Sequence, residues 1–356
     1  MVDGRVGKNV GMSGTWPSVS VVMTVLNEER HLRDAIDRLL DQDYPGPLDV
    51  VVAVGPSTDK THAVAAAIAA ANTHVRVVDN PSGRTPSGLN SAIAATDSEI
   101  VVRIDGHAMV GPEYVRTAVE TLQETGADNV GGVMAAEGTN AFEDAVARAM
   151  TSRFGVGGAS FHVGGEPGPA PTVYLGSFRR SALDRVGGYD ESMVRAQDWE
   201  MNLRIRESGG VVWFTPDLRV TYRPRHTLGA LARQYHDYGR WRREVVRRHP
   251  QTLSARYLAA PVAVAGVAAG TALALVGAVT RRPALVGVGL AAPAGYALLD
   301  LAGSALTART APRLSVRSAV RLPIVYATMH GSWGAGFLRG LPRSERRAAA
   351  ASAPGD

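Results

Sequence analysis

In SVVMTVLNEE, residues 20–29, an apolar run ends abruptly in a polar loop. A short continuous run of this kind predicts a strand that is buried on both faces. The same pattern recurs along the chain, with helical stretches between the runs. Strands are predicted at 20–26, 49–55, 75–80, 99–105 and 129–135, and helices at 28–40, 60–72, 86–95 and 112–125. This alternation predicts an α/β, Rossmann-like fold, with a mostly parallel sheet and helices on both faces.

The composition excludes several classes of protein. The chain has 356 residues, of which 45% are hydrophobic and 20% charged, so it is too apolar to be disordered. It contains no cysteine, which excludes disulfide frameworks, thiolate zinc sites and cysteine nucleophiles. The first 26 residues lack an apolar core long enough for a signal peptide. The Gly- and Pro-rich stretch 155–171 predicts a mobile loop inside one catalytic unit.

Charge is distributed unevenly along the chain. Residues 1–218 carry 18 basic and 28 acidic side chains, whereas residues 219–356 carry 20 basic and 5 acidic ones. A basic half can bind nucleic acid, but here the arginines flank long apolar runs instead of alternating with aromatic residues on a polar groove. We therefore expect anionic lipid, and no nucleic acid, as the partner of this half.

Two apolar segments are long enough to cross a membrane. Residues 258–279 contain no charge, and residues 284–306 contain only Asp300. Each could span the ~30 Å of a bilayer core as a helix, and the small residues of GVAAG at 266–270 would let the two helices pack closely. A buried hairpin of a soluble protein is the alternative. A third run, 322–338, could be re-entrant, spanning or interfacial.

A helix with two faces is predicted over residues 227–247. Its apolar stripe consists of Leu228, Leu231, Tyr235, Tyr238, Trp241 and Val245. Its basic stripe consists of Arg233, His236, Arg240, Arg243 and Arg247. Such a helix can lie in the membrane interface with its arginines on lipid phosphates or on the diphosphate of a polyprenyl acceptor. The alternative is an ordinary helix that is docked on the domain and has a solvated charged face.

Polar residues follow the predicted strands where a parallel sheet binds its ligands. Three strands lead into VLNEE (25–29), GPSTDKT (55–61) and NPSGRTPSGLN (80–90), loops suited to a nucleotide. The fourth ends in RIDGHAMV, where Asp105 and His107 could hold Mg²⁺ or Mn²⁺, although an Asp-Gly turn explains the motif equally well. Asp198 begins an amphipathic helix, which makes it either a functional carboxylate or an N-cap.

In this order, the motifs VLNEE, STDKT, GRTPSGLN, DGH, FRRSALDRVGGYDE and QDWEMN resemble those of the inverting family 2 glycosyltransferases, which have the GT-A fold. The resemblance covers residues 17–250. QDWEMNLRIRESGG and the apolar C-terminal half are most similar to bacterial exopolysaccharide glucosyltransferases of the succinoglycan type, which extend lipid-linked oligosaccharides.

The resemblance implies a role for each matching position. The nucleotide-sugar pocket would be formed by Asn27, Glu28, Asp59, Arg84 and Asp105. Asp105 and His107, in place of the family's Asp-x-Asp pair, would bind a divalent metal, Mg²⁺ or Mn²⁺, and Asp198 would be the catalytic base. Gly55 stands where family members commonly have an aspartate that reads uracil, which leaves the donor base open.

The acceptor side is implied by a second, partial match. The resemblance places Trp199, Arg240 and Trp241 there; Arg240 and Trp241 are all that DYGRW (237–241) keeps of the Gln-x-x-Arg-Trp motif of processive synthases. Addition of a single sugar is therefore expected instead of processive synthesis.

These observations lead to one expected organisation. It comprises a flexible N-terminus (1–16), a GT-A catalytic domain (17–225), a basic amphipathic interface helix with a linker (226–256), a membrane region (257–340) and a tail (341–356).

The expected function is transfer of a hexose, glucose from UDP-glucose in the first instance, onto a lipid-linked saccharide. The enzyme would belong to the cell membrane, with the catalytic domain on its cytoplasmic face. The alternatives are a polyprenyl-phosphate glycosyltransferase, a short-chain polysaccharide synthase and a non-catalytic nucleotide-sugar-binding membrane protein.

Overall fold

The protein is described here by a computed structural model, which covers residues 15–350. Its first half is a parallel sheet in the order β3-β2-β1-β4. These strands are β1 (Val19–Val25), β2 (Leu48–Val54), β3 (Val75–Asp79) and β4 (Ile100–Arg103). Successive side chains of β1 enter two different core clusters, one on each face of the sheet, which explains its unbroken apolar run. The predicted α/β architecture is confirmed.

The second half of the sheet is mixed instead of parallel. The predicted strand at 129–135 is β6 (Asn129–Ala136), but it is separated from β4 by β8 (Tyr174–Arg179), which is antiparallel to both neighbours. β9 (Val212–Tyr222) continues the sheet parallel to β6. Two short strands, β5 (Met109–Val110) and β7 (Gly168–Pro169), pair with β9. The sequence analysis missed β8 and β9 because YLGSFR and VWFTPDLRVTY interrupt their apolar residues with glycine, proline and charge.

The four predicted helices of the first half are confirmed. They are α1 (Leu32–Leu40), α2 (Thr61–Ala71), α3 (Thr85–Ala94) and α4 (Tyr114–Thr125). The first helix starts four residues later than predicted, because residues 28–31 form the turn that carries part of the site.

The stretch expected to be a mobile loop contains regular structure. After α5 (Ala141–Met150) come the short helices α6 (Arg153–Val156) and α7 (Ser160–Val163) and then β7. A serine caps α6, since the Ser152 hydroxyl accepts a hydrogen bond from the backbone of Gly155. Short helices and a short strand thus lie in the stretch 155–171, where the sequence analysis predicted a mobile loop. The chain continues through α8 (Arg180–Val186) and α9 (Gln197–Glu207).

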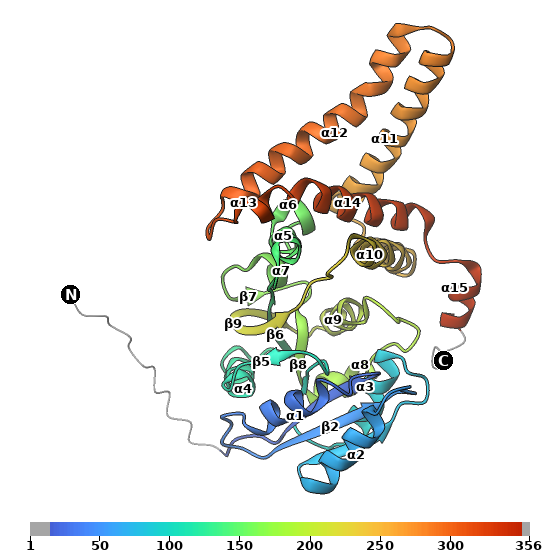
Figure 1. Cartoon of the computed structure of the whole chain (residues 1–356). Helices are drawn as coiled ribbons and strands as arrows, with labels where there is room; N and C mark the ends of the chain where they lie inside the picture. Colours follow the sequence, from blue (N-terminus) through green and yellow to red (C-terminus); the bar gives the residue numbers. More distant parts are fainter. Residues whose placement is uncertain (1–14, 351–356) are drawn as a thin grey trace, which may run out of the picture.

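Two long helices form a hairpin that projects from the rest of the molecule (Figure 1). These are α11 (Ala255–Val279) and α12 (Pro283–Arg309), both long and apolar enough to cross a membrane. Only 11% of the apolar window of each is buried, so a core hairpin of a soluble protein is not what the structure shows. The helices touch at small residues, since a Cβ on Gly270 would lie 2.5 Å from the carbonyl oxygen of Gly289.

A pair of closely packed helices lies between the hairpin and the sheet (Figure 1). α10 (Leu228–Arg248) packs along α14 (Leu322–Arg339), which runs across the base of the hairpin. Their backbones are in direct contact, because a Cβ on Gly239 or on Gly336 would lie 2.0 Å from a carbonyl oxygen of the other helix. The remaining elements are η1 (Pro250–Thr252), α13 (Val316–Ala319) and α15 (Arg343–Ala350).

The two stripes predicted on α10 are only partly as expected. Leu231, Tyr235, Trp241 and Val245 are buried, but Leu228 and Tyr238 are 40% and 39% exposed. Three arginines of the basic stripe have protein partners. Arg240 pairs with Asp237 and Glu345, Arg243 donates to the last carbonyls of α14, and Arg247 pairs with Glu244. Arg240 and Arg243 thus connect α10 to α15 and α14, whereas the partner of Arg247 lies on α10 itself, and the lipid-facing role of this stripe stays a prediction.

Candidate active site

The loops after β1 and β2 are joined by hydrogen bonds at the carboxyl edge of the sheet. The side-chain oxygen of Asn27 accepts from the backbone of Thr58 at 2.8 Å, and its own N–H donates to Ser57 Oγ at 3.1 Å. Asp59 accepts from the backbone of Glu29 at 3.2 Å and from that of Thr61 at 3.0 Å. Partial burial raises the pKa of Asp59, but the hydrogen bonds from Thr61 and Glu29 outweigh it and lower the pKa overall. Asn27 and Asp59, which are both predicted to line the nucleotide pocket, thus lie in two loops that hydrogen bonds join to each other.

The β4 loop reaches the same edge through His107. Its Nδ1 lies 3.0 Å from Oε1 of Glu28, and this hydrogen bond raises the pKa of His107 against the opposing effect of burial. The backbone can approach so closely because residue 106 is glycine: a Cβ there would lie 2.5 Å from Cγ1 of Val25. The structure therefore brings together two predicted residues, His107 and Glu28, from different strand ends.

Arg103 connects the two aspartates that the sequence singled out. Its guanidinium, only 4% exposed, donates from Nε and Nη2 to Oδ1 of Asp105 at 3.1 and 3.0 Å, and from Nη1 to Oδ1 of Asp198. The face of its guanidinium lies 5.9 Å from the ring centroid of Tyr189. A cation buried in this way needs paired carboxylates, so each of the three charges fixes the position of the others. The sequence analysis quoted Arg103 but gave it no role.

Asp198 is the second residue of α9 and not its cap. The N-cap position is held by Ala196, in a left-handed conformation (φ 62°) and without a side-chain hydrogen bond, so the capping interpretation of Asp198 is wrong. Burial raises the pKa of Asp198; the charge of Arg103 opposes this and that of Asp105 adds to it. With 26% of its side chain exposed, Asp198 can still be reached from solvent.

The other carboxylates near α9 are occupied. Asp190 accepts from Arg248 at 3.1 Å, Glu191 accepts from Ser87 and Asn90, and Glu200 pairs with Arg204. Glu200 is also only 3% exposed. Among the carboxylates at 190, 191, 198 and 200, Asp198 is the one that lies beside Asp105, on the shared arginine.

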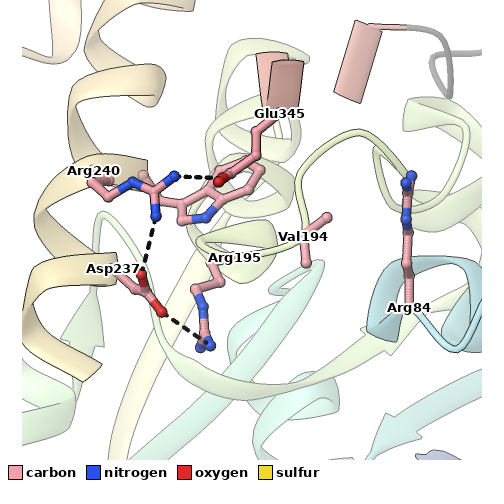
Figure 2. Close-up of a pocket in the computed structure, with 7 residues that line it drawn as sticks. Arg84, Val194, Arg195, Asp237, Arg240 and Glu345 are labelled. Atoms are coloured by element: carbon pink, nitrogen blue, oxygen red, sulfur yellow. Dashed lines mark hydrogen bonds and ion pairs between the residues drawn. The ribbon is translucent and has the colours of Figure 1, made fainter. Parts of the chain in front are cut away.

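A pocket of about 280 Å³ opens beside the loop that leads into α9 (Figure 2). It is lined by Arg84, Val194, Arg195, Asp237, Arg240, Trp241 and Glu345. Asp237 lies between Arg195 and Arg240, at 3.6 and 3.5 Å, and Glu345 of α15 pairs with Arg240 from the other side. Figure 2 shows Arg84 across the opening from this chain of ion pairs. The opening is therefore lined by three arginines and two carboxylates, and Arg195 and Arg240 are paired with those carboxylates.

Of the residues predicted for the acceptor side, Trp199 and Trp241 pack in the same apolar cluster, but they face different openings. Arg240 and Trp241 line the pocket, whereas Trp199 lies against Arg242 of α10, with the guanidinium carbon 4.5 Å from its ring centroid. Trp241 is 7% exposed and packs with Met193, so it supports the α9 loop. The sequence analysis missed Arg195, Asp237 and Glu345, because their pairing depends on helices that lie far apart in the chain.

Gly55 lies against the backbone of the β3 loop. A Cβ at this position would lie 3.2 Å from Cα of Gly83 and 3.3 Å from the carbonyl oxygen of Val25. A side chain here would require its neighbours to give way by a few tenths of an ångström, so the glycine that replaces the uracil-reading aspartate lies in a closely packed part of the loop.

Comparison with known proteins defines the class of this site. The family model described as "Glycosyl transferase family 2" matches residues 20–187. The chain is 33% identical over 337 residues to a curated relative, covering 94% of this chain and 98% of that protein. It therefore belongs to the family 2 glycosyltransferases.

That relative is the succinoglycan biosynthesis protein ExoA of Rhizobium meliloti (strain 1021). A second relative, 22% identical, is the dolichyl N-acetyl-alpha-D-glucosaminyl phosphate 3-beta-D-2,3-diacetamido-2,3-dideoxy-beta-D-glucuronosyltransferase of Methanococcus voltae; the match covers 62% of this chain and 71% of that one. The mannosyltransferase PcManGT of Pyrobaculum calidifontis, solved in complex with GDP-Man and Mn²⁺, has a similar fold. Its TM-score is 0.56, with 21% identity, and the match covers 91% of this chain and 86% of that one.

Proposed function

We propose that this glycosyltransferase moves a hexose from a nucleotide sugar to a lipid-linked saccharide, with inversion at the anomeric carbon. The observation that carries the proposal is the placement of Asp198 beside Asp105 on the single guanidinium of Arg103. One carboxylate can serve as base while the other, bound to the same guanidinium, serves the donor diphosphate. The relationship to ExoA supports a role in exopolysaccharide or cell-envelope glycan synthesis.

Asp198 acts as the general base in this proposal. Its carboxylate takes the proton of the acceptor hydroxyl while the oxygen attacks the anomeric carbon, and the bond to the diphosphate breaks on the opposite face. The bonding electrons leave with the nucleoside diphosphate. A raised pKa suits this role, because burial makes the carboxylate a stronger base than one in water. Arg103 holds it ionised and fixed in direction.

Asp105 and His107 are the residues that would hold a divalent cation. A carboxylate oxygen and an imidazole nitrogen suit Mn²⁺ or Mg²⁺, and His107 uses Nδ1 for Glu28, so Nε2 is the nitrogen left for a metal. Among residues 15–350 no three His, Asp or Glu side chains converge on one point, so the donor diphosphate would have to complete the coordination. When bound, the cation would stabilise the charge of the leaving diphosphate. The Mn²⁺ in PcManGT supports this assignment.

The nucleotide would lie over the joined loops of β1 and β2. Asn27, Glu28 and Asp59 border it there, and Arg84 extends the positive lining towards the pocket of Figure 2. UDP-glucose is the first donor to test. The packing at Gly55 argues that the base is read by other groups, so GDP-sugars belong in the same panel. PcManGT was solved with a GDP-sugar.

The acceptor would be presented from a membrane in which α11 and α12 are embedded, with the catalytic domain on the cytoplasmic face. The hairpin is apolar, exposed and flanked by arginines at 256, 281, 282 and 309. The name of the second relative, a dolichyl-linked transferase, supports a lipid-linked acceptor.

A donor panel tests the function. Membranes containing the full chain are given UDP- and GDP-hexoses with polyprenyl diphosphate saccharides, and products are separated by mass. Transfer by the wild type, lost in Asp198→Asn, is the expected result. Transfer to bare polyprenyl phosphate as the minimal acceptor would instead indicate a polyprenyl-phosphate glycosyltransferase. A processive ladder of products would indicate a synthase, and donor binding with no transfer would indicate a binding protein.

A further inference from the structure

Arg242 connects the helix that carries Asp198 to the first helix of the hairpin. Its guanidinium carbon lies 4.5 Å from the ring centroid of Trp199 and 4.3 Å from that of Tyr257. Trp199 follows Asp198 directly in α9, and Tyr257 lies in the first turn of α11. A planar cation stacked between two rings is held firmly in position. Arg242 therefore has a fixed place between the proposed base and the start of the hairpin.

A second cation shares the same ring. Arg256 stacks on Tyr257 at 4.6 Å, and within the described part of the chain neither Arg242 nor Arg256 forms an ion pair. Burial lowers the pKa of Arg242, and the charge of Arg256 lowers it further. The other arginines in the second half of α10 differ from Arg242 because they have partners that accept hydrogen bonds. Arg240, Arg243, Arg247 and Arg248 all contact carboxylates or backbone carbonyls.

Arg242 also has a donor that no protein group satisfies. Its Nη1 is buried and has no hydrogen-bond partner among the described residues. A buried charged donor without an acceptor is costly, and a nearby cation adds to the cost, so the arrangement is complete only with an anion. The hydroxyl of Ser254, at the N-cap of α11, is likewise buried without a partner and caps no N–H group. This positive helix end adds to the attraction, but the arginine pair carries the argument.

We propose that Arg242 and Arg256 bind the phosphate of the lipid-linked acceptor. This rests on the proposed function, which takes the acceptor to be lipid-linked. The guanidinium fork matches phosphate oxygens, and its place at the start of α11 is where a lipid phosphate would lie if the hairpin crosses the bilayer. A phosphate bound to Arg242 would be close to the first turn of α9, because Arg242 contacts the ring of Trp199 and Trp199 follows Asp198 in that turn. The saccharide attached to that phosphate can then reach the base.

The experiment measures the acceptor KM of the full chain in phosphatidylcholine nanodiscs. Two synthetic acceptors carry the same saccharide, one on a polyprenyl diphosphate and the other on a neutral alkyl chain. For Arg242→Gln we expect the KM of the phosphorylated acceptor to rise about tenfold or more, as for loss of charge-assisted hydrogen bonds. The KM of the neutral acceptor and of the nucleotide sugar should stay unchanged. Arg242→Lys should lie between, because it keeps the charge and loses the planar fork.

Two further variants keep the test independent of folding. Arg256→Gln changes an exposed residue and should raise the same KM in the same direction by a smaller factor. Arg38→Gln, an exposed arginine in the last turn of α1 and outside the basic stripe of α10, is the control and should change neither KM. The inference is wrong if the wild type transfers sugar and if the KM for the phosphorylated acceptor is the same in Arg242→Gln and Arg256→Gln as in the wild type. If the wild type transfers to neither acceptor, the proposed function itself fails.

A last arm identifies the source of the phosphate. Replacing part of the phosphatidylcholine by phosphatidylglycerol should leave the wild-type KM unchanged if Arg242 binds the acceptor. Competitive inhibition by phosphatidylglycerol that disappears in Arg242→Gln would assign the site to bulk anionic lipid and overturn the proposal.

Discussion

Asp105 and Asp198, 93 residues apart in the chain, accept hydrogen bonds from the same guanidinium, that of Arg103. The donor side and the acceptor side of the proposed reaction are thereby fixed relative to each other by one buried side chain. A change in the position of β4 or of α9 would move both. This arrangement leads to four predictions.

Asp198→Asn should reduce transfer by 10² to 10⁴, the usual contribution of general-base catalysis, while donor binding is kept. The amide keeps the shape and can still accept from Arg103, but it cannot take a proton. Initial rates and nucleotide-sugar binding by calorimetry measure the two effects separately. Asp97→Asn, an exposed aspartate outside the site, is the control. A folded Asp198→Asn enzyme within about threefold of wild type would exclude this residue as the base.

Arg103→Met should destabilise the protein by about 3–5 kcal/mol, because it leaves two carboxylates without their buried counter-ion. Denaturant unfolding of the detergent-solubilised chain measures the change in the free energy of unfolding. The matched control is Arg116→Met, which breaks the more exposed pair with Asp43 and should cost less than about 1 kcal/mol. Equal effects of the two substitutions would show that Arg103 has no special structural role.

The acidic limb of the pH dependence of kcat/KM should move to higher pH in Arg103→Gln. The wild-type limb lies above the ordinary aspartate value of 3.8, because burial raises the pKa of Asp198, and activity falls as the pH drops through that pKa. Arg103 lowers the pKa, so its removal means that the base is protonated at a higher pH. Arg116→Gln should leave the limb in place. An unmoved limb in Arg103→Gln would contradict Asp198 as the titrating base.

Removal of divalent metal should abolish transfer, and Asp105→Ala should do so with metal present. The chelator EDTA removes the cation that would neutralise the leaving diphosphate, and restoring Mn²⁺ or Mg²⁺ should restore activity. Asp97→Ala should keep both the activity and the metal dependence. Full transfer in excess EDTA would contradict a metal at Asp105 and His107.

Most of the site residues could be predicted from the sequence, because parallel strands bring their carboxyl ends to one edge. The order of strands and helices was sufficient to predict that the motifs around Asn27, Asp59 and Asp105 lie together. The metal and base roles of these residues stay predictions until the experiments above are done.

The missing part of the site depends on tertiary contacts. The antiparallel strand β8 lies between β4 and β6 in the sheet, and the chain continues from it through α8 to α9, which carries Asp198. The apolar pattern of β8 is short and interrupted, so little in the sequence indicated this strand. The partner of Asp198, Arg103, was visible only as the one charge within the apolar run IVVRI, residues 100–104. An arginine in a strand buried on both faces must have a counter-ion, and that signal could have identified Arg103.

The glycine contact between α10 and α14 has a consequence for which side chains these helices can carry. At Gly239 and Gly336 backbone lies against backbone, so even an alanine at either position would have to push the two helices apart. The helix that carries Arg242 and the helix at the base of the hairpin are therefore expected to tolerate only glycine where they touch.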